Sequence, residues 1–459
     1  MKLNFIFIVG CTVLAAPALL ASSRASSVAE EPALVQLRET VAELRRELEA
    51  LRATGPFDGG QAELERRIDL LAAEVERLRT AGPVGEEPTL EGGKGLAPAA
   101  SKVYRKAHGV SIGGYGEALY TNAAASRQDG TPSERGSRVD YLRQVLYVGY
   151  KFSDKILLNS ELEIEHAKVG EEAGGELALE FAYLELQPRR EIGLRAGLLL
   201  LPLGFLNELH EPPVSRGARR PLVETAIIPS TWRENGLGLF GEAGPLQWRA
   251  YVVAGLSSAG FSAQGLRGGR QEGSLSSAND LGLTGRVDLA GRGLLAGGSF
   301  FSGESGQGAR VGGRELTARV TLFDLHAQYE RAGLRLRGLW ARSTLADAAR
   351  VNEHNGLSGA ASVGGAQSGW YLEASYDVLT LVSPGRWSLI PYLRYEWLDT
   401  QQRVPAGYAR DPGREQNALA GGLELKPLPQ VVFKLDYQRL RDGARQGISQ
   451  WQLALGYLF

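Results

Sequence analysis

Cysteine is almost absent from this chain, since Cys11 is the single one in 459 residues. One thiol cannot build a disulfide framework. Beyond residue 25 the chain also lacks any apolar run of about 18 residues, which excludes a transmembrane helix. The five histidines show no paired metal-ligand spacing, and residues 109–459 contain no G-x-S-x-G or phosphate-loop motif. We therefore predict no enzymatic activity, no catalytic residue, no metal and no cofactor.

The chain also lacks an excess of either positive or negative charge, because it has 51 Lys and Arg and 52 Asp and Glu. The formal net charge of −1 gives no bulk attraction to nucleic acid, so we predict no nucleic-acid partner. Lysine is scarce at nine residues, and arginine supplies nearly all the positive charge. The mean hydropathy of −0.17 does not exclude a membrane β-barrel, because lumen-facing and lipid-facing residues cancel along each strand.

The first 25 residues have the pattern of a secretory signal peptide. Lys2 gives a positive start, an apolar stretch covers residues 3–21, and Ser23–Ala25 provides a small-x-small cleavage site. Cys11 lies inside the apolar stretch rather than at its end. We therefore expect residues 1–25 to be removed during export.

Residues 26–80 contain two short segments with heptad character. In residues 33–52 and 64–78, apolar residues are spaced alternately three and four apart, with Glu and Arg on the other faces. This pattern predicts a periplasmic coiled coil that self-associates. The alternative is a pair of amphipathic helices that fold back on each other or on the main domain. Residues 81–108 are rich in Gly and Pro and predict a linker.

From residue 109 onward, short segments with a period of two recur along the chain. The C-terminal residues 449–459, SQWQLALGYLF, place a large apolar residue at every second position, as a strand with one apolar face does. Seven short and eight long links alternate strictly between sixteen such segments. An even strand number with short turns at one end and long loops at the other is typical of outer-membrane barrels. We therefore predict an all-β fold, a 16-stranded antiparallel transmembrane β-barrel over residues 109–459.

Two further expectations concern individual strands. The count of sixteen strands requires residues 314–330 to form one long strand. Its apolar residues move from one face to the other between Leu322 and Phe323, which we assign to a β-bulge. The first strand, near 110–120, should pair with the last to close the barrel. Trp451, Tyr457 and Phe459 give the last strand an aromatic ending suited to the membrane interface. This ending resembles the signal that the outer-membrane assembly machinery reads.

The faces opposite the lipid carry many charged residues. Unpaired charges in a packed core would be very costly, so we expect water to reach them through an open lumen. For any single residue, the alternative is an ion pair between neighbouring strands. The lumen-wall candidates are Glu161, Glu163, Glu165, Arg143, Arg195, Arg249 and Arg286.

The longest link, residues 201–234, has a composition that indicates a functional loop or one folded into the barrel. The block LRAGLLLLPLGFLNELHEPPVSRGARRPLVETAIIPSTWRENGLG, residues 194–238, resembles the phosphate-selective porin O/P family of outer-membrane porins. So does SIGGYGEALY, residues 111–120. The resemblance implies a trimeric pore that the third long loop narrows. The constriction candidates that it implies are Arg216, Arg219, Arg220, Arg233, Glu208 and His210.

The chain departs from a phosphate-selective pore in its scarce lysine and in the run Glu161, Glu163 and Glu165. We therefore expect a passive channel for small hydrophilic solutes or ions, general or anion-biased, in the outer membrane. The alternative function is a structural outer-membrane protein whose coiled coil links the barrel to the periplasm or cell wall. A conducting lumen would distinguish the two.

Overall fold

The computed structural model describes residues 92–459 apart from 171–173, 383–384 and 386. The predicted signal peptide, the predicted coiled coil and residues 81–91 of the predicted linker lie outside the described residues. None of the helices in the described part of the chain is long and apolar enough to cross a membrane.

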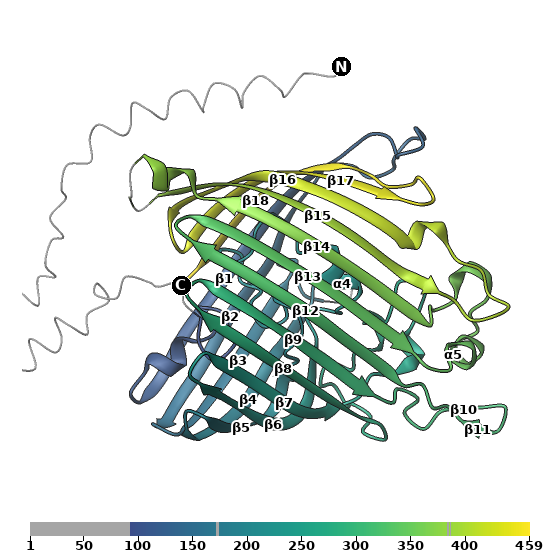
Figure 1. Ribbon diagram of the computed structural model, residues 1–459, viewed down its shortest axis with the longest axis horizontal. Helices are drawn as coiled ribbons and strands as arrows, with labels where there is room; N and C mark the ends of the chain where they lie inside the picture. The colour runs from purple at the N-terminus through teal and green to yellow at the C-terminus, as the bar shows by residue number, and fades with distance from the viewer. Residues whose placement is uncertain (1–91, 171–173, 383–384, 386) are drawn as a thin grey trace, which may run out of the picture. The chain divides into compact units, whose positions relative to one another are not determined.

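Sixteen antiparallel strands close into one barrel, as the sequence predicts (Figure 1). Adjacent wall strands follow one another in sequence, with one small hairpin between β9 and β12, except where the first and last strands meet. The wall strands are β1 (Gly109–Ala123), β2 (Arg138–Ser153), β3 (Ile156–Glu165), β4 (Leu177–Arg189), β5 (Ile192–Leu200), β6 (Arg233–Ala243), β7 (Leu246–Ala254), β8 (Leu281–Gly291), β9 (Leu294–Gly303), β12 (Val320–Arg331), β13 (Leu334–Leu345), β14 (Ala366–Tyr376), β15 (Ser388–Arg403), β16 (Glu415–Leu428), β17 (Val431–Asp442) and β18 (Gln450–Leu458).

Short helices and one small hairpin lie in the connections between the wall strands. The hairpin of β10 (Arg310–Val311) and β11 (Arg314–Glu315) and the helix α5 (Ala348–His354) lie at the end opposite the C-terminus (Figure 1). The other helices are η3 (Lys102–Arg105), α4 (Leu222–Ala226), η4 (Ser258–Gly260), η5 (Arg267–Gly269), η6 (Gly359–Ala361), η7 (Val378–Leu381) and η8 (Pro412–Arg414).

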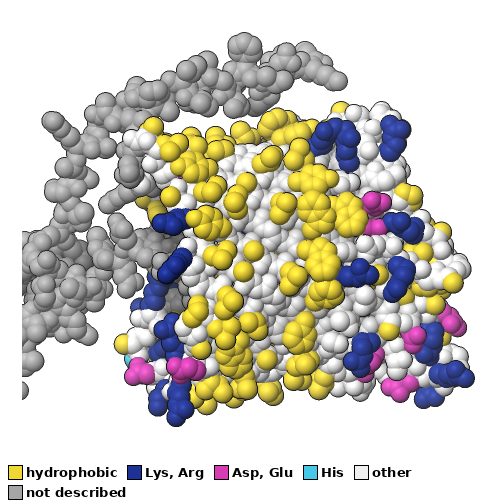
Figure 2. Space-filling model, in the orientation of Figure 1, with side chains coloured by type: hydrophobic (Ala, Val, Ile, Leu, Met, Phe, Trp, Pro, Cys, Tyr) yellow, Lys and Arg dark blue, Asp and Glu magenta, His cyan; other side chains and the backbone are white. Residues whose placement is uncertain are grey.

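The period of two sorts side chains between lipid and lumen. In β17, Phe433, Leu435 and Tyr437 are exposed on the outer face, whereas Lys434 and Asp436 are buried on the inner one. Figure 2 shows hydrophobic side chains spread over the wall, with charged side chains toward the ends of the strands. An apolar outer band with charged ends matches the profile of a bilayer.

The barrel closes between β1 and β18, as predicted. Their register runs from Tyr115 opposite Leu458 to Ala123 opposite Gln450. The terminal Phe459 extends the ladder by exchanging two backbone hydrogen bonds with Gly114. A Cβ at Gly114 would lie 2.7 Å from the Phe459 ring, so this glycine makes room for the terminal aromatic residue.

The predicted bulge between Leu322 and Phe323 is wrong. β12 begins at Val320, and its register with β9 and β13 is continuous through both residues. Leu322 faces the lumen and Phe323 faces outward. Leu322 is apolar because it belongs to the buried cluster that the loop between β5 and β6 forms inside the barrel. The apparent phase slip therefore reflects an apolar patch on the inner wall.

Candidate functional site

The loop between β5 and β6, residues 201–232, folds into the lumen, and we call it the inserted loop. Asn207 fixes its base. The Asn207 side chain donates to the carbonyls of Leu201 (2.6 Å) and Trp232 (2.8 Å) and accepts from the Trp232 N–H (2.6 Å). One buried amide thus joins the two ends of the loop where they leave the wall.

The inserted loop has its own apolar core inside a polar barrel. Glu224 of α4 is fully buried in that core, where it accepts hydrogen bonds from Phe205 N–H (2.8 Å), Leu206 N–H (2.6 Å) and the Tyr371 hydroxyl (2.7 Å). Burial raises the pKa of Glu224 above its ordinary value. The buried apolar residues of the loop are Leu201, Leu203, Phe205, Leu206, Val223, Ile227, Ile228 and Trp232.

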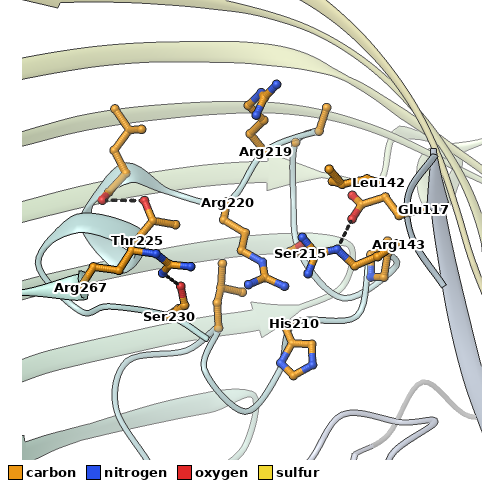
Figure 3. Close-up of a pocket in the computed structure, with 15 residues that line it drawn as sticks. Glu117, Leu142, Arg143, His210, Ser215, Arg219, Arg220, Thr225, Ser230 and Arg267 are labelled. Atoms are coloured by element: carbon orange, nitrogen blue, oxygen red, sulfur yellow. Dashed lines mark hydrogen bonds and ion pairs between the residues drawn. The ribbon is translucent and has the colours of Figure 1, made fainter. Parts of the chain in front are cut away.

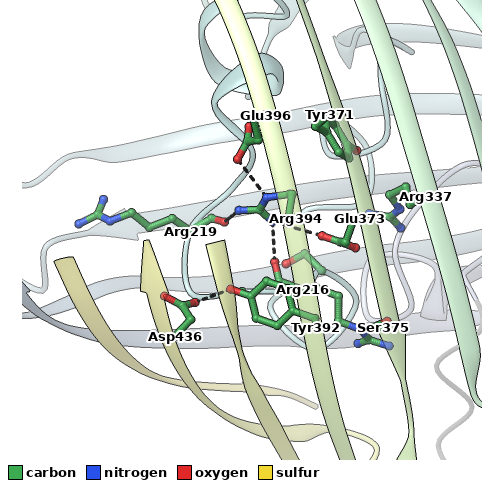
Figure 4. A network of polar contacts seen from close by, with 12 residues as sticks. Arg216, Arg219, Arg337, Tyr371, Glu373, Ser375, Tyr392, Arg394, Glu396 and Asp436 are labelled. Carbon is green, nitrogen blue, oxygen red and sulfur yellow. Dashed lines mark hydrogen bonds and ion pairs between the residues drawn. The ribbon is translucent and has the colours of Figure 1, made fainter. Parts of the chain in front are cut away.

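Arg394 of β15 holds the middle of the inserted loop against the wall (Figure 4). Its guanidinium donates to the carbonyls of Arg216 (3.1 Å) and Arg219 (3.0 Å). The same group pairs with Glu373 (3.2 Å) and Glu396 (3.0 Å), which neutralise it. The planar fork of donors lets one side chain bind two loop carbonyls and two carboxylates at once.

Neighbouring strands bind the same stretch of the loop through carboxylates. Glu424 of β16 pairs with Arg216 (3.0 Å) and accepts from the Gly217 N–H (2.9 Å). Asp436 of β17 accepts from the Ala218 N–H (2.6 Å). The loop is therefore held by backbone hydrogen bonds to wall charges, which sets the position of the residues that follow it, 219 and 220.

A cavity of about 250 Å³ lies between the inserted loop, β1 and β2 (Figure 3). Arg220 extends into this space between Arg267 and Arg143, with His210 below it in the view. Its lining is Glu117, Leu142, Arg143, Leu206, His210, Pro212, Ser215, Gly217, Ala218, Arg219, Arg220, Leu222, Thr225, Ser230 and Arg267. We call it the arginine cavity.

The arginine cavity carries an excess of positive charge. Its one carboxylate, Glu117, pairs with Arg143 (3.5 Å), which also pairs with Glu163 (3.0 Å). Within the part of the chain that the structure describes, the Arg219 guanidinium donates only to the Thr121 hydroxyl (3.3 Å), and the Arg220 side chain makes no hydrogen bond or ion pair. Unneutralised guanidiniums facing a water-accessible cavity attract anions.

The third such guanidinium, Arg267, comes from the loop between β7 and β8. It donates to the carbonyl of Ser230 on the inserted loop. Burial, together with the neighbouring Arg270 and Arg220 guanidiniums, lowers the pKa of Arg267 to about 10. Arg267 is therefore charged at neutral pH but under repulsion that a bound anion would relieve.

A second, smaller cavity of about 60 Å³ lies on the other side of Arg267 and is mainly acidic. Arg233 pairs there with Glu180 (2.7 Å) and Glu272 (3.6 Å). The charged residues lining it are Glu163, Glu165, Glu176, Glu180, Glu272, Arg233, Arg267 and Arg270. The two cavities share Arg267, so opposite signs of charge lie side by side.

The structure separates the six constriction candidates. Arg219, Arg220 and His210 line the arginine cavity, and His210 pairs with Glu161 (3.1 Å). Arg216 is bound to Glu424 on the wall, and Arg233 lines the acidic cavity instead. Glu208 pairs with Arg249 (3.4 Å) and is buried.

The lumen-wall candidates face inward, but most are not open to water. Glu161, Arg195, Arg249 and Arg286 are at most 6% exposed. Arg195 pairs with Glu185 (2.8 Å), while Arg249 (3.5 Å) and Arg286 (2.6 Å) share Asp288. The expectation that water must reach these charges is wrong at these positions, because carboxylates and inserted segments neutralise them. Arg143, Glu163 and Glu165 form a linked group beside the two cavities.

Sequence reasoning missed two contributors to the site. Arg267 and Arg270 lie in residues 255–280, a long loop whose RGGR motif is its one basic cluster. Residues 92–108 were expected to be a linker, yet Leu96, Ala99, Ala100 and Val103 are buried within the barrel. The described residues include no group of His, Cys, Asp and Glu arranged to hold a metal ion.

The closed 16-stranded barrel, its alternating short turns and long loops, and the loop folded into its lumen define a porin-like β-barrel fold. In a search of known proteins, the chain is 37% identical over 379 residues to an uncharacterized protein of Aquifex aeolicus (strain VF5), covering 80% of this chain and 83% of that protein. The chain belongs to the same family as that protein. No family model matches it.

Among solved structures, OmpF of Salmonella typhi in complex with daunomycin superposes with a TM-score of 0.51 at 12% identity, over 77% of this chain and 98% of that chain. The anion-selective porin of Comamonas acidovorans gives a TM-score of 0.49 at 14% identity, over 76% of this chain and 99% of that chain. At such identity the likeness to OmpF shows the fold alone.

Proposed function

We propose that this chain is an outer-membrane porin, a water-filled channel through which small hydrophilic solutes or ions diffuse passively, with an anion bias. The observation that carries the proposal is the arginine cavity. Within the described part of the chain, Arg219, Arg220 and Arg267 face it without a carboxylate partner, and its one acid, Glu117, is paired with Arg143. In a narrow site, fixed charges of one sign set which ions pass.

The inserted loop is suited to hold such a constriction at fixed width. Asn207 joins its two ends, and Arg394 binds its middle to β15. The arginines that follow Arg216 and Ala218 are therefore presented from a backbone with several wall contacts. A rigid support keeps the charges at the cavity instead of letting them fold onto nearby carboxylates.

The acidic cavity beside Arg267 argues against a pore dedicated to phosphate. Five glutamates line that cavity together with three arginines. A multiply charged anion that approached along this side would meet repulsion before it reached Arg220. We therefore propose general permeation of small hydrophilic solutes and ions with a moderate anion bias. This proposal does not include selectivity for phosphate of the kind that names the O/P family.

The test is the reversal potential of the purified protein in a planar bilayer under a KCl gradient. We expect its sign to report anion preference, and Arg220→Gln to shift it toward zero. Arg292→Gln is the matched control, because Arg292 is an exposed arginine in the short β8–β9 turn, away from the cavity. Equal shifts in both variants, or none in either, would argue against the arginine cavity as the selective element.

We further propose a homotrimer in the membrane, with residues 26–80 forming the coiled coil in the periplasm. The likeness of the loop block to the O/P porins supports the trimer, and the heptad spacing supports the coiled coil. Native mass spectrometry in detergent would count the protomers. The same measurement after removal of residues 26–80 would show whether the heptads or the barrel hold them together.

A structural role is the second candidate, favoured by one observation. Residues 92–105 and the inserted loop fill much of the barrel interior, and a tether between membrane and cell wall needs no open pore. Folded protein without conductance, together with binding to isolated cell wall, would support this role over the porin.

A further inference from the structure

Residues 92–105, directly before the first strand, lie inside the barrel and contact the wall on the side of β1 to β7. We call them the N-terminal segment. Leu96 shares a pocket with Phe181, Tyr183 and Tyr251. Val103 packs on Gly149, where a Cβ would lie 2.7 Å from the valine, so β2 is shaped to receive the segment.

Polar wall residues bind the backbone of the same segment. Asn159 of β3 donates to the carbonyl of Ala100 (2.9 Å). Arg195 of β5 donates to the carbonyl of Lys94 (3.1 Å) and to the Tyr104 hydroxyl (3.0 Å). Tyr104 in turn donates to Glu185 (2.7 Å). The wall behind the segment is thus charged and hydrogen-bonding, a surface that water can also solvate.

One side chain joins the N-terminal segment to the inserted loop. The carboxylate of Glu211 accepts hydrogen bonds from the N–H groups of Ala99 (2.9 and 3.1 Å) and Ala100 (3.0 Å). Glu211 is fully buried. The contact therefore links two segments that are more than 100 residues apart in the sequence.

Beyond Glu211, the inserted loop continues across the end of the barrel that carries the short turns. Lys426 donates to the carbonyl of Pro213 (2.6 Å), and Arg335 donates to that of Val214 (2.8 Å). Both wall residues lie within two residues of a strand end at a short turn. Short turns mark the periplasmic end of such barrels. The N-terminal segment and loop residues 211–217 thus cover complementary parts of the periplasmic half of the lumen.

We infer that the N-terminal segment is a removable plug, latched by Glu211, that closes the periplasmic side of the path leading from the arginine cavity. The inference rests on the proposed channel function. The floor of the arginine cavity is made by residues of the same loop, among them His210, Pro212 and Ser215. Release of the segment removes the support beneath this floor and exposes a polar wall.

Small side chains and replaceable hydrogen bonds suit the segment to release. Its stretch from Gly95 to Ser101 is GLAPAAS. Withdrawal exposes Leu96 and Val103, which belong to the main buried cluster, while Asn159, Glu185 and Arg195 regain water as a hydrogen-bonding partner.

The experiment compares single-channel conductance of the full chain with that of Ala99→Pro and Glu211→Ala. Proline at 99 removes one N–H of the latch. Alanine at 211 removes the acceptor. We expect each variant to show a several-fold higher open probability or conductance than the parent. Ala409→Pro is the matched control, since it also removes a loop N–H from a hydrogen bond, to Gly359, at the opposite end of the barrel.

A disulfide provides the reverse test in protein with Cys11→Ser. Val103→Cys with Gly149→Cys would tie the segment to β2 through a disulfide. A shift of about 1 Å brings the two Cβ atoms to the spacing that is ordinary in a disulfide. We expect the oxidised double variant to stay in the low-conductance state even when Glu211→Ala is added. Reduction should then release it. Heat-modifiable migration on a gel identifies the folded barrel in each case.

The outcomes separate the plug from the channel. Unchanged conductance in folded Ala99→Pro and Glu211→Ala, with a conducting parent, would overturn the plug and leave the porin standing. No conductance from the parent or any released variant would overturn the porin itself. If Ala99→Pro does not fold, reduction of the oxidised Glu211→Ala triple variant decides the plug alone.

Discussion

Arg220 and Arg267 reach the same cavity from two different loops, and no carboxylate among the residues that the structure describes forms an ion pair with either one. Arg267 is held by the carbonyl of Ser230, whereas Arg220 projects freely into the space (Figure 3). A chain with nearly balanced charge has therefore concentrated unneutralised cations at one internal position. Such a concentration has consequences that can be measured.

Reversal of the charge at residue 220 should reverse the ion preference. Arg220→Glu would place a carboxylate beside Arg267 and Arg143, so the cavity would lose its anion excess. We expect the reversal potential in a KCl gradient to move toward cation preference by more than in Arg220→Gln. Arg292→Glu makes the same charge change in an exposed turn and should leave the reversal potential unchanged.

Loss of the Asn207 side chain should loosen the inserted loop without unfolding the barrel. Asn207→Ala leaves the buried N–H of Trp232 without its acceptor, a cost of about 1–3 kcal/mol. We expect larger fluctuations of the open-channel current and faster cleavage of the loop by protease. Asn417→Ala, which removes a partly exposed amide whose oxygen accepts from the Tyr395 hydroxyl, is the control and should change neither.

Arg394 should be irreplaceable by lysine. Arg394→Lys keeps the charge near Glu373 and Glu396 but cannot hold the carbonyls of Arg216 and Arg219 in one plane. Arg394→Ala leaves two buried carboxylates without their cation, which costs about 3–5 kcal/mol. We expect a lower temperature of heat modification in both variants, with alanine the lower. A lysine variant equal to the parent would contradict this role.

The Glu211 latch should respond to pH. Burial raises the pKa of Glu211 from 4.5 to about 7, while the hydrogen bonds from Ala99 and Ala100 and the neighbouring His210 oppose the rise and Glu161 adds to it. Tyr147 also faces the group. A carboxyl whose pKa is raised in the folded protein stabilises the folded state most at low pH, and this contribution is lost as pH rises from 4.5 through about 7.

We therefore expect the temperature of heat modification of the parent protein to fall between pH 5 and 8, because Glu211 must ionise in a buried position. Glu211→Gln removes the titrating group and should flatten this part of the pH dependence. A temperature that rises over this range in the parent, or an equal fall in both proteins, would contradict the assigned sign.

The terminal Phe459 should matter for assembly more than for the folded barrel. Its backbone pairs with Gly114, and its ring lies so close to this residue that a Cβ at Gly114 would come within 2.7 Å of it. Deletion of Phe459 removes one pair of ladder bonds and the aromatic ending. We expect less folded barrel in the outer membrane of cells, measured by heat-modifiable migration. Deletion of the exposed loop residue Gly130 is the control for a change of one residue.

Much of the fold could be predicted because the residues within a barrel strand are enough to specify that strand. Alternation of apolar and polar residues over about ten positions specifies a strand with two faces, and turn residues specify the links. The strand number, the long and short connections and the pairing of the first strand with the last all follow from this pattern. The alternation in residues 449–459 thus predicted strand β18 correctly.

The contents of the lumen could not be predicted in the same way, since they depend on contacts between distant residues. Leu322 breaks the alternation because it meets the inserted loop, and the segment before β1 is packed because Asn159, Arg195 and Glu211 bind its backbone. The sequence by itself determined the wall. Apolar and polar residues alternate along each strand because one face meets lipid and the other meets polar surroundings. Only the tertiary structure decided which inward charges are neutralised and which, like Arg220, remain free, because ion pairing depends on distances between residues that the chain brings together only when it folds.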